Sequence, residues 1–487
     1  MPNDVMCRSW LVSVATGVVL LVPGCTPVPR VGGVPVAPAG PDAVWHPPRA
    51  AVARDSIGEP VLPKEVAAHA DSLTLSEMVS LALRNNPATR VSWAQAQMAA
   101  DTYGAARAGF FPMIDAGINA GRLGSRASSS RNGNAALQST ITPSVTLSYT
   151  VLDFGAAKAR ALSARETAFA LSFTHNATIQ STVFGVEQAY YMYAMARAVL
   201  GAQQLSLREA QVSYQAASKR DSVGMATLAD VMQARTAVAQ AQLALDTAEV
   251  AVETTHARLA VAFGARPTAP YDVTKCVEDI DVTSVAASVE SLVNEAIQQR
   301  PDVQAARANI RAAEAAVTAA RSALRPTLNL SATYGYLGGY QQTVAARDYT
   351  VSLGLSFPVF HGLADRYEIS RAKAATESEI ASAAALEQTV ALDVVVAYHQ
   401  LRGATDAVVT SEALLASTAA AMDVVRARYG AGLGTILDLL TAQSSLASAR
   451  AQQARARWSW AQQLAMLAFA VGALDERGTI SLPTAPR

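Results

Sequence analysis

The sequence is poor in the residues that usually anchor a compact globular core. Aromatic residues make up only 6% of the chain, and its three cysteines, at positions 7, 25 and 276, are too few and too dispersed for a disulfide framework or a zinc finger. Basic and acidic residues balance at 39 each, so no net charge attracts nucleic acid. No uninterrupted run of 18 apolar residues follows residue 30, which argues against helical membrane spans.

Alanine dominates instead. It supplies 101 of the 487 residues and much of the 51% hydrophobic fraction. Because alanine favours helix and buries little surface, this composition is typical of long helices packed closely side by side.

The amino terminus reads as an export signal. Arg8 precedes a mostly apolar stretch, residues 9–22, that is too short to span a bilayer. The stretch ends in Leu-Val-Pro-Gly before Cys25, which resembles the lipobox of bacterial lipoproteins. We expect residues 1–24 to be removed and Cys25 to be acylated, and Thr26 favours the outer membrane. An ordinary signal with a coincidental cysteine is the alternative. Residues 25–71 are proline-rich and predict an extended leash.

The body of the chain repeats itself. Leu-Arg-Asn-Asn-Pro at 83–87 corresponds to Ile-Gln-Gln-Arg-Pro at 297–301, an offset of 214. Gly-Met-Ala-Thr-Leu-Ala-Asp at 224–230 corresponds to Gly-Leu-Gly-Thr-Ile-Leu-Asp at 432–438, an offset of 208. One unit of about 210 residues therefore occurs twice. We expect a first repeat at 72–266, a linker at 267–285, a second repeat at 286–474 and a tail at 475–487.

Each repeat contains two strand-like segments. In 111–123, Ile114 and Ile118 alternate with Asp115 and Asn119, and a similar alternation follows in 141–152 after a polar loop at 124–140. The second repeat has the pattern at 327–337 and 349–360. The sequence thus predicts β-hairpins at 111–152 and 327–360, with strands long enough to cross a bilayer at a barrel tilt.

Helical segments surround each hairpin. A short helix is predicted from Thr74 to the residue before Pro87, and a second from Pro87 to about Ala108. After each β-hairpin comes a proline-free stretch with apolar residues spaced by 3.5, the coiled-coil period. Glycines near 224 and 432 interrupt these stretches, which predicts two long antiparallel helical hairpins.

Four membrane-length strands cannot close on themselves. An open sheet edge in lipid leaves backbone groups without partners, at several kcal/mol each. Two copies would give eight strands, and three would give twelve, wide enough to begin enclosing a lumen. The alternative is a soluble sheet packed on the helices. The signal segment and the alternation of small with apolar residues favour the membrane.

The chain resembles the TolC-like outer-membrane factors, in their lipoprotein branch. The resemblance lies in the Asn-Pro and Arg-Pro helix starts at 86–87 and 300–301, the Phe-Pro and Arg-Pro pairs before the strands, and above all residues 428–443. It implies a homotrimer with a twelve-stranded barrel in outer-membrane lipid, continued by a twelve-helix periplasmic coiled-coil tunnel. It also implies docking to a periplasmic adaptor and to an inner-membrane pump, either proton-driven (RND) or ATP-driven (ABC).

The same resemblance assigns roles at the hairpin turns. It places Asp230, Tyr429 and Asp438 at a periplasmic gate facing the lumen. It also makes the turns the adaptor-docking tips, with these residues: Gly224, Met225, Ala226, Gly432, Leu433 and Gly434. Gly434 stands where the prototype has a gate arginine, and Thr441 where it has an aspartate, so its salt-bridge latch is not expected. The alternative role for Asp230 and Asp438 is helix capping.

No enzyme is indicated. The six histidines lack metal-ligand spacing, and the glycine run at 430–434 has neither a preceding strand nor a following lysine for a phosphate loop. We expect no catalytic residues, metal or cofactor. A periplasmic adaptor or an envelope-spanning structural lipoprotein would share some of these features but not the doubled membrane-length hairpins. The predicted function is the exit duct of a tripartite export system for small molecules, with type I protein secretion as the alternative.

Overall fold

The computed structural model describes residues 30–31, 34–35, 73–125, 136–273, 288–340 and 346–474. The chain divides into two units, residues 1–59 and 60–487. In the first unit the described residues form a short antiparallel pair, β1 (Arg30–Val31) and β2 (Val34–Pro35). The expected signal 1–24, Cys25 and the tail 475–487 lie outside the described residues, as does most of the predicted leash and linker.

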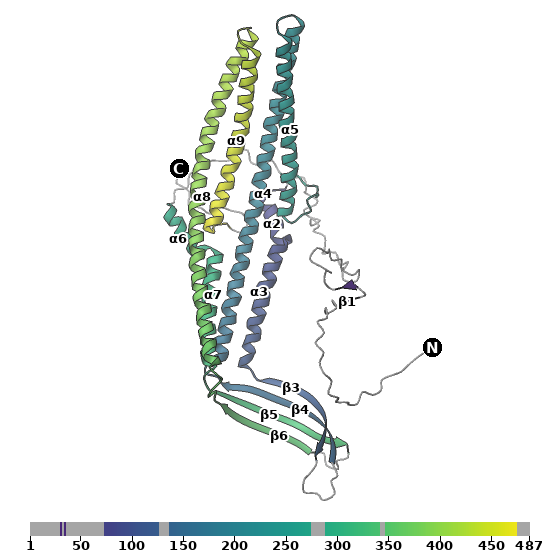
Figure 1. Cartoon of the computed structure of the whole chain (residues 1–487), viewed down its shortest axis with the longest axis vertical. Coiled ribbons are helices and arrows are strands. Elements are labelled where there is room, and N and C mark those ends of the chain that lie inside the picture. Colours follow the sequence, from purple (N-terminus) through teal and green to yellow (C-terminus); the bar gives the residue numbers. More distant parts are fainter. Residues whose placement is uncertain are drawn as a thin grey trace, which may run out of the picture. The chain divides into compact units, whose positions relative to one another are not determined.

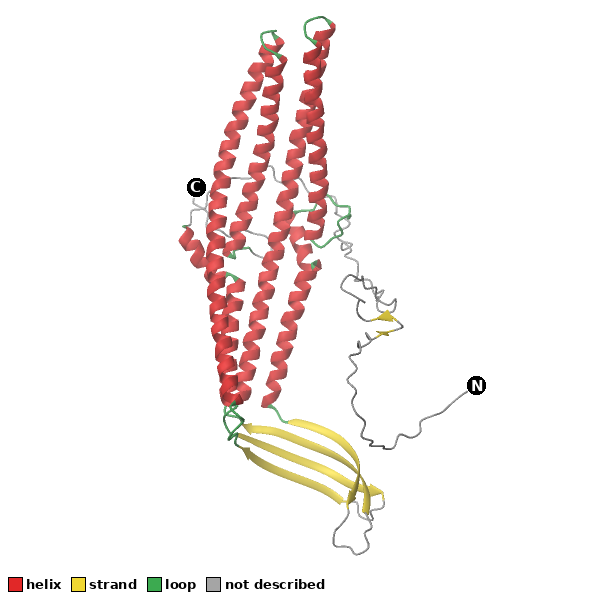
Figure 2. Cartoon of the chain, in the orientation of Figure 1, coloured by secondary structure: helices red, strands yellow, loops and turns green. Residues whose placement is uncertain are grey.

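The second unit is made of long helices and one four-stranded sheet (Figures 1 and 2). Its first half runs α2 (Leu75–Asn85), α3 (Pro87–Ala106), the 3₁₀ turn η2 (Arg107–Phe110), β3 (Met113–Ser125), β4 (Ala136–Leu152), α4 (Ala156–Ser222) and α5 (Leu228–Ala262). Its second half runs α6 (Val289–Gln299), α7 (Pro301–Ser322), β5 (Thr327–Tyr340), β6 (Ala346–Ser356), α8 (Ala364–Gly430) and α9 (Ile436–Val471).

The element starts reproduce the sequence repeat. Helices α2 and α6 start at 75 and 289, a difference of 214, and strands β3 and β5 start at 113 and 327, again 214 apart. Helices α4 and α8 start at 156 and 364, a difference of 208, and each has 67 residues. The six missing residues of the second half therefore fall within the strand pair, between the starts of β5 and α8.

Local sequence sets the helix ends. Thr74 caps α2 in a capping box with Glu77, and the Asn86 side chain accepts a hydrogen bond from the Ala88 N–H at 2.8 Å to cap α3. Pro87 occupies the first turn of α3, where its missing N–H has no helical partner to lose. The break predicted before Pro87 is confirmed.

The regularly spaced apolar residues of the two long helices are buried where the short helices pack against them. On α4, Val183 and Val186 are fully buried against α2 and the end of α5, where Phe263 is also fully buried. On α8, Val390 and Val394 are buried in the same way against α6 and the end of α9. Each half thus has its own core at the level of its short helix. A third core lies near the hairpin ends, where Met422, Ile436 and Leu439 are buried.

The four strands form one antiparallel sheet in the order β3-β4-β5-β6. The polar loop expected at 124–140 is shorter, because β3 continues to Ser125 and β4 begins at Ala136, which pairs with Ser125. Strand β6 runs Ala346–Ser356 and not 349–360. It stops before Pro358, which cannot donate a ladder hydrogen bond. Backbone pairing extended the other strands through polar residues that the alternation pattern could not include.

The sheet has one apolar and one polar face. Directly opposed residues share a face, and one row across the four strands is Ala116, Val145, Tyr334 and Tyr349. The adjacent row, on the other face, is Asp115, Thr146, Thr333 and Thr350. Val145, Tyr334 and Tyr349 of the apolar face are exposed in the described part of the chain.

Helix α8 contains an 18-residue window with a mean hydropathy of 1.5, apolar and long enough by composition to cross a membrane. Only 22% of that window is buried. The helix nevertheless packs along α7 and α9 within the bundle. We therefore regard it as an alanine- and valine-rich bundle helix.

An ion-pair cluster joins α4 to α7. The Glu166 side chain is 5% exposed and binds Arg165 and Arg311, each at 2.7 Å. Burial alone would raise the pKa of Glu166, but the two arginines outweigh it and hold the pKa below its usual value. The cluster therefore stabilises the fold above the pKa of unfolded glutamate, and the contribution is lost as pH falls through the lowered folded pKa.

We predict that Glu166→Ala lowers the free energy of unfolding by about 1–3 kcal/mol, because it leaves two arginines without their shared partner. The control is Glu387→Ala, which removes the half-exposed pair with Arg307 and should lower it by about 0–1 kcal/mol. Thermal unfolding of the purified protein in detergent measures both changes. Equal losses of unfolding free energy in the two variants would contradict the conclusion that the Glu166 ion pairs are the more stabilising ones.

Candidate functional site at the hairpin ends

The two helical hairpins turn in the same way. Gly224 and Gly432 both have φ of 77°, the left-handed conformation that glycine adopts without a Cβ penalty. The Met225 N–H donates to the Arg220 carbonyl at 2.7 Å, and the Leu433 N–H donates to the Arg428 carbonyl at 2.8 Å. Each long helix thus ends in a Schellman turn, which satisfies carbonyls that the helix leaves free.

The returning helices begin with matching caps. The Thr227 hydroxyl accepts from the Asp230 N–H at 3.2 Å, and the Asp230 carboxylate accepts from the Thr227 N–H at 2.9 Å. Thr435 and Asp438 repeat these contacts at 3.2 and 3.1 Å. Hydrogen bonds from the backbone N–H and hydroxyl of Thr227 lower the pKa of Asp230, and those from Thr435 lower the pKa of Asp438. The capping role considered from the sequence is therefore observed for both aspartates.

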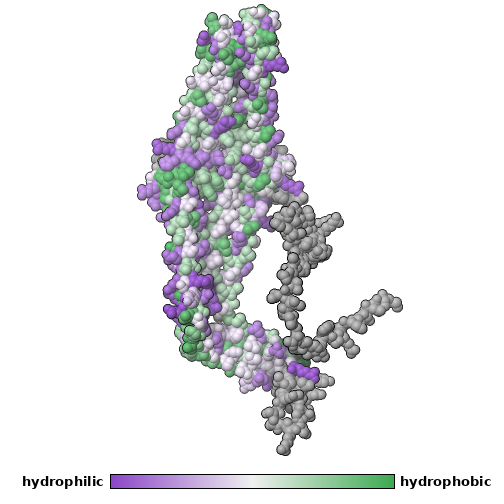
Figure 3. Space-filling model, in the orientation of Figure 1, coloured by the Kyte–Doolittle hydropathy of each residue, from purple (hydrophilic) through white to green (hydrophobic). Residues whose placement is uncertain are grey.

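Apolar side chains stand exposed on the turns. Met225 is 69% exposed and Leu433 is 73% exposed. Figure 3 shows hydrophobic residues among polar ones at this end of the hairpins. Ala226 is half-buried, and Gly434 is close to the preceding helix, since a Cβ there would lie 3.3 Å from the Tyr429 nitrogen. The predicted docking residues thus lie together on the two turns.

An arginine that the sequence analysis did not single out joins the two ends. Arg220, in the last turn of α4, donates from Nη1 to the Tyr429 carbonyl at 2.7 Å. Its guanidinium carbon also lies 4.6 Å from the centre of the Tyr429 ring, within cation–π range. The only sequence signal is positional: an arginine stands four residues before each turn glycine, at 220 and 428.

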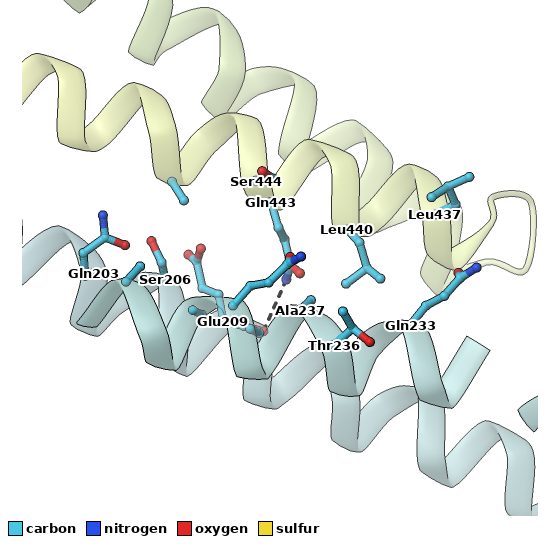
Figure 4. A pocket seen from close by; sticks show the side chains of 15 residues that line it. Gln203, Ser206, Glu209, Gln233, Thr236, Ala237, Leu437, Leu440, Gln443 and Ser444 are labelled. Atoms are coloured by element: carbon cyan, nitrogen blue, oxygen red, sulfur yellow. Dashed lines mark hydrogen bonds between the residues drawn. The ribbon is translucent and has the colours of Figure 1, made fainter. Parts of the chain in front are cut away.

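The same two hairpins are joined farther along α4 and α9. Gln443 donates from Nε2 to the Glu209 carbonyl at 3.2 Å, and Arg450 pairs with the Glu209 carboxylate at 2.9 Å. Figure 4 shows Gln443 and Leu440 of α9 projecting toward α4 and α5 beside a cavity of about 440 Å³. The lining is mostly glutamine, serine, threonine and alanine.

The three predicted gate residues have separate hydrogen-bond partners in the single chain. Asp230 and Asp438 bind the threonines of their own turns, and Tyr429 is bound by Arg220. Within the single chain, Arg220 and not an aspartate links Tyr429 of α8 to the end of α4. A lumen-facing role for the aspartates stays a prediction.

Two histidines make side-chain contacts away from the hairpin ends. Ser92 Oγ lies 2.8 Å from His175 Nδ1, and His361 pairs with Asp365 at 2.9 Å. Among the residues that the structure describes, no group of three or more His, Cys, Asp or Glu side chains could hold a metal ion.

Comparison with known proteins identifies the family to which this architecture belongs. The family described as outer membrane efflux protein matches residues 78–265 and 292–473, which are the two repeats. The chain belongs to this family. The resemblance to TolC-like outer-membrane factors is thereby confirmed, as is the predicted fold class of helices with two tandem repeats and strand pairs. The family is one of transport channels.

Individual relatives cover most of the chain. Protein CyaE of Bordetella pertussis is 30% identical over 78% of this chain and 80% of its own length. The pyoverdine export outer membrane protein OpmQ of Pseudomonas putida is 28% identical over 61% of this chain and 63% of its own. A crystal structure of a membrane protein from Pseudomonas aeruginosa superposes with a TM-score of 0.72 at 25% identity, covering 82% of this chain and 93% of that one.

We predict that Thr227→Ala frays the start of α5, because an N-cap side chain contributes about 1 kcal/mol. Hydrogen exchange of the first turn of α5 should accelerate at neutral pH. Since the folded pKa of Asp230 is lowered, the cap is present above the usual aspartate pKa and is lost as pH falls through the folded value.

The matched control is Thr236→Ala, which removes a hydroxyl that bonds to the Met232 carbonyl inside α5. It should leave exchange in the first turn unchanged. Unaltered exchange in Thr227→Ala would show that the turn is held by other contacts.

Proposed function

We propose that three copies of this chain form an outer-membrane channel, the exit duct of a tripartite export system. The observation that carries this proposal is the sheet with one apolar face and one polar face. In a lipid-spanning barrel, apolar residues face the lipid and polar residues face the lumen, with a period of two. Membership of the outer membrane efflux protein family supports the location.

Closure of the sheet requires more than one copy, and the resemblance to TolC-like outer-membrane factors favours three. Within the described sheet, β3 pairs on one side with β4 and β6 pairs on one side with β5. Joining β6 of each copy to β3 of the next gives twelve strands and removes every open edge. The helices of the three copies would continue the barrel as a twelve-helix periplasmic tunnel.

The hairpin ends are the proposed contact with the rest of the export system. Exposed Met225 and Leu433 lie on turns shaped by Gly224 and Gly432 and offer an apolar docking surface to a periplasmic adaptor, with Ala226 and Gly434 beside them. An inner-membrane pump would complete the path. At the same end we place the gate, with Tyr429 restrained by Arg220 and with Asp230 and Asp438 at the lumen.

Anchoring adds a second attachment to the membrane. We propose that Cys25 is acylated and holds the chain in the outer membrane through the leash of residues 25–71. A duct of this kind needs no catalytic residue and no cofactor, and we assign no enzyme activity to it.

Small molecules are the cargo that we propose. The relative from Pseudomonas putida is named as a pyoverdine export protein, which favours efflux of small compounds. Secretion of a protein by a type I system, with an ATP-driven (ABC) pump in place of a proton-driven (RND) pump, is the alternative. The duct passes what its pump supplies, so identifying the pump decides between them.

A photoreactive residue at Met225 should crosslink in cells to a periplasmic adaptor, and mild solubilisation should recover the pump with it. A proton-driven pump would support small-molecule efflux, whereas an ATP-driven exporter would overturn it in favour of protein secretion. The control is the same residue at exposed Val250, in the middle of α5. Crosslinks from Met225 to this chain alone would contradict docking at the hairpin ends.

A further inference from the structure

The internal repeat places residues of one hairpin against residues of the other by a fixed offset of 208. Hairpin 1 (α4 and α5) contacts hairpin 2 (α8 and α9) within the chain. If copies are arranged around an axis, hairpin 2 must also meet hairpin 1 of the next copy. This step rests on the proposed trimer. Because the hairpins are built alike, the contact seen inside one chain is a template for the contact between chains.

The template for the ends is the Arg220–Tyr429 contact. Adding 208 to 220 gives Arg428, and subtracting 208 from 429 gives Asp221. The contact between copies therefore places Arg428 beside Asp221 of the partner subunit. The position that the Tyr429 ring occupies beside Arg220 would be taken by the Asp221 carboxylate beside Arg428.

Arg428 lies near Asp438 of its own turn, whose pKa it helps to lower, and its guanidinium has donors for a second carboxylate. Arg428 is exposed and donates to the Leu433 carbonyl of its own turn at 3.4 Å, a long hydrogen bond. Asp221 is half-buried, and among the described residues no ion pair involves its carboxylate. A guanidinium within reach of a carboxylate forms a charge-assisted hydrogen bond, which is stronger than one between neutral groups.

The groove beside Arg428 supports the same arrangement. Helix α9 of hairpin 2 lies against a groove on hairpin 1 (Figure 4). The groove is lined by Glu209, Ala210, Gln233 and Ala237. The residues 208 positions later are Ser417, Thr418, Thr441 and Ser445, and all four line an open cavity of about 640 Å³ on hairpin 2. Among the described residues, this second groove is lined by α8, α9 and the turn between them alone.

The helix that fits this groove is also identified by the offset. Leu440 and Gln443 of α9 lie at the first groove, and the residues 208 positions earlier are Met232 and Arg235 of α5. Both are exposed. The groove on hairpin 2 is lined by Asp438, an acceptor for an arginine.

We propose that α5 of the next copy docks in the groove between α8 and α9, and that Arg428 pairs there with Asp221 of the partner subunit. Three such pairs would link the hairpin ends into a ring. Within each copy the ends are joined by Arg220 and Tyr429, and between copies by the charged pair. The prototype's latch residues, absent at Gly434 and Thr441, are not needed for this joint.

Crosslinking in the full-length protein tests the pairing. In a Cys276→Ser background, Asp221→Cys combined with Arg428→Cys is treated with a short bismaleimide and separated on a denaturing gel. We expect bands of two and three joined chains. Asp221→Cys combined with Arg426→Cys, on the opposite side of α8, and each single cysteine serve as controls and should stay at one chain.

A charge swap gives an independent readout. Asp221→Arg or Arg428→Asp alone should raise the leak of the purified channel in planar bilayers, and the double swap should restore it. Crosslinks no stronger than the controls, in protein that native mass spectrometry shows to be trimeric, would overturn the pairing and leave the proposed function standing. A chain that is not trimeric would overturn the proposed function itself.

Discussion

The constraint on which the rest depends is that a four-stranded sheet with an apolar face has two open edges. In lipid those edges have no water to satisfy their backbone groups, so the sheet must close with strands from other copies. Toward the hairpin ends, the groove between α8 and α9 is open in the described structure and can receive a helix of another copy in the same way. If the proposed trimer forms, the chain is one third of an assembly, and its thin alanine-rich packing suits helices whose remaining contacts lie with other copies.

The internal duplication explains why the two hairpin turns share their backbone geometry although the side chains beside them differ. The two turns share their left-handed glycines and their Thr–Asp caps, because a tight helix reversal demands that geometry wherever it occurs. The side chains beside them have diverged. Arg220 lies over a tyrosine, whereas Arg428, at the equivalent position, lies opposite an aspartate once the repeat is continued around an axis. The first joint acts within a chain and the second between chains.

The sequence was sufficient for features that depend on local chemistry or on self-similarity. Pro87, Thr74 and the turn glycines act over a few residues, and the repeat needs no structure at all, so element order and hairpin ends were predicted. The ends of the strands were not, because ladder hydrogen bonds continue through polar residues such as Ser125, where no alternation is visible. Arg220 was missed because its partner is 209 residues away and lies opposite only after folding.

The most direct test of the central claim compares Val351→Arg with Ser352→Arg. Val351 is on the apolar face of β6 and is 68% exposed, while its neighbour is on the polar face. An arginine facing lipid near mid-bilayer costs about 2–4 kcal/mol, and one facing a lumen costs little. The trimer recovered from outer membranes should fall steeply for Val351→Arg and stay near normal for Ser352→Arg, with altered conductance. Equal recovery of both variants would contradict the account.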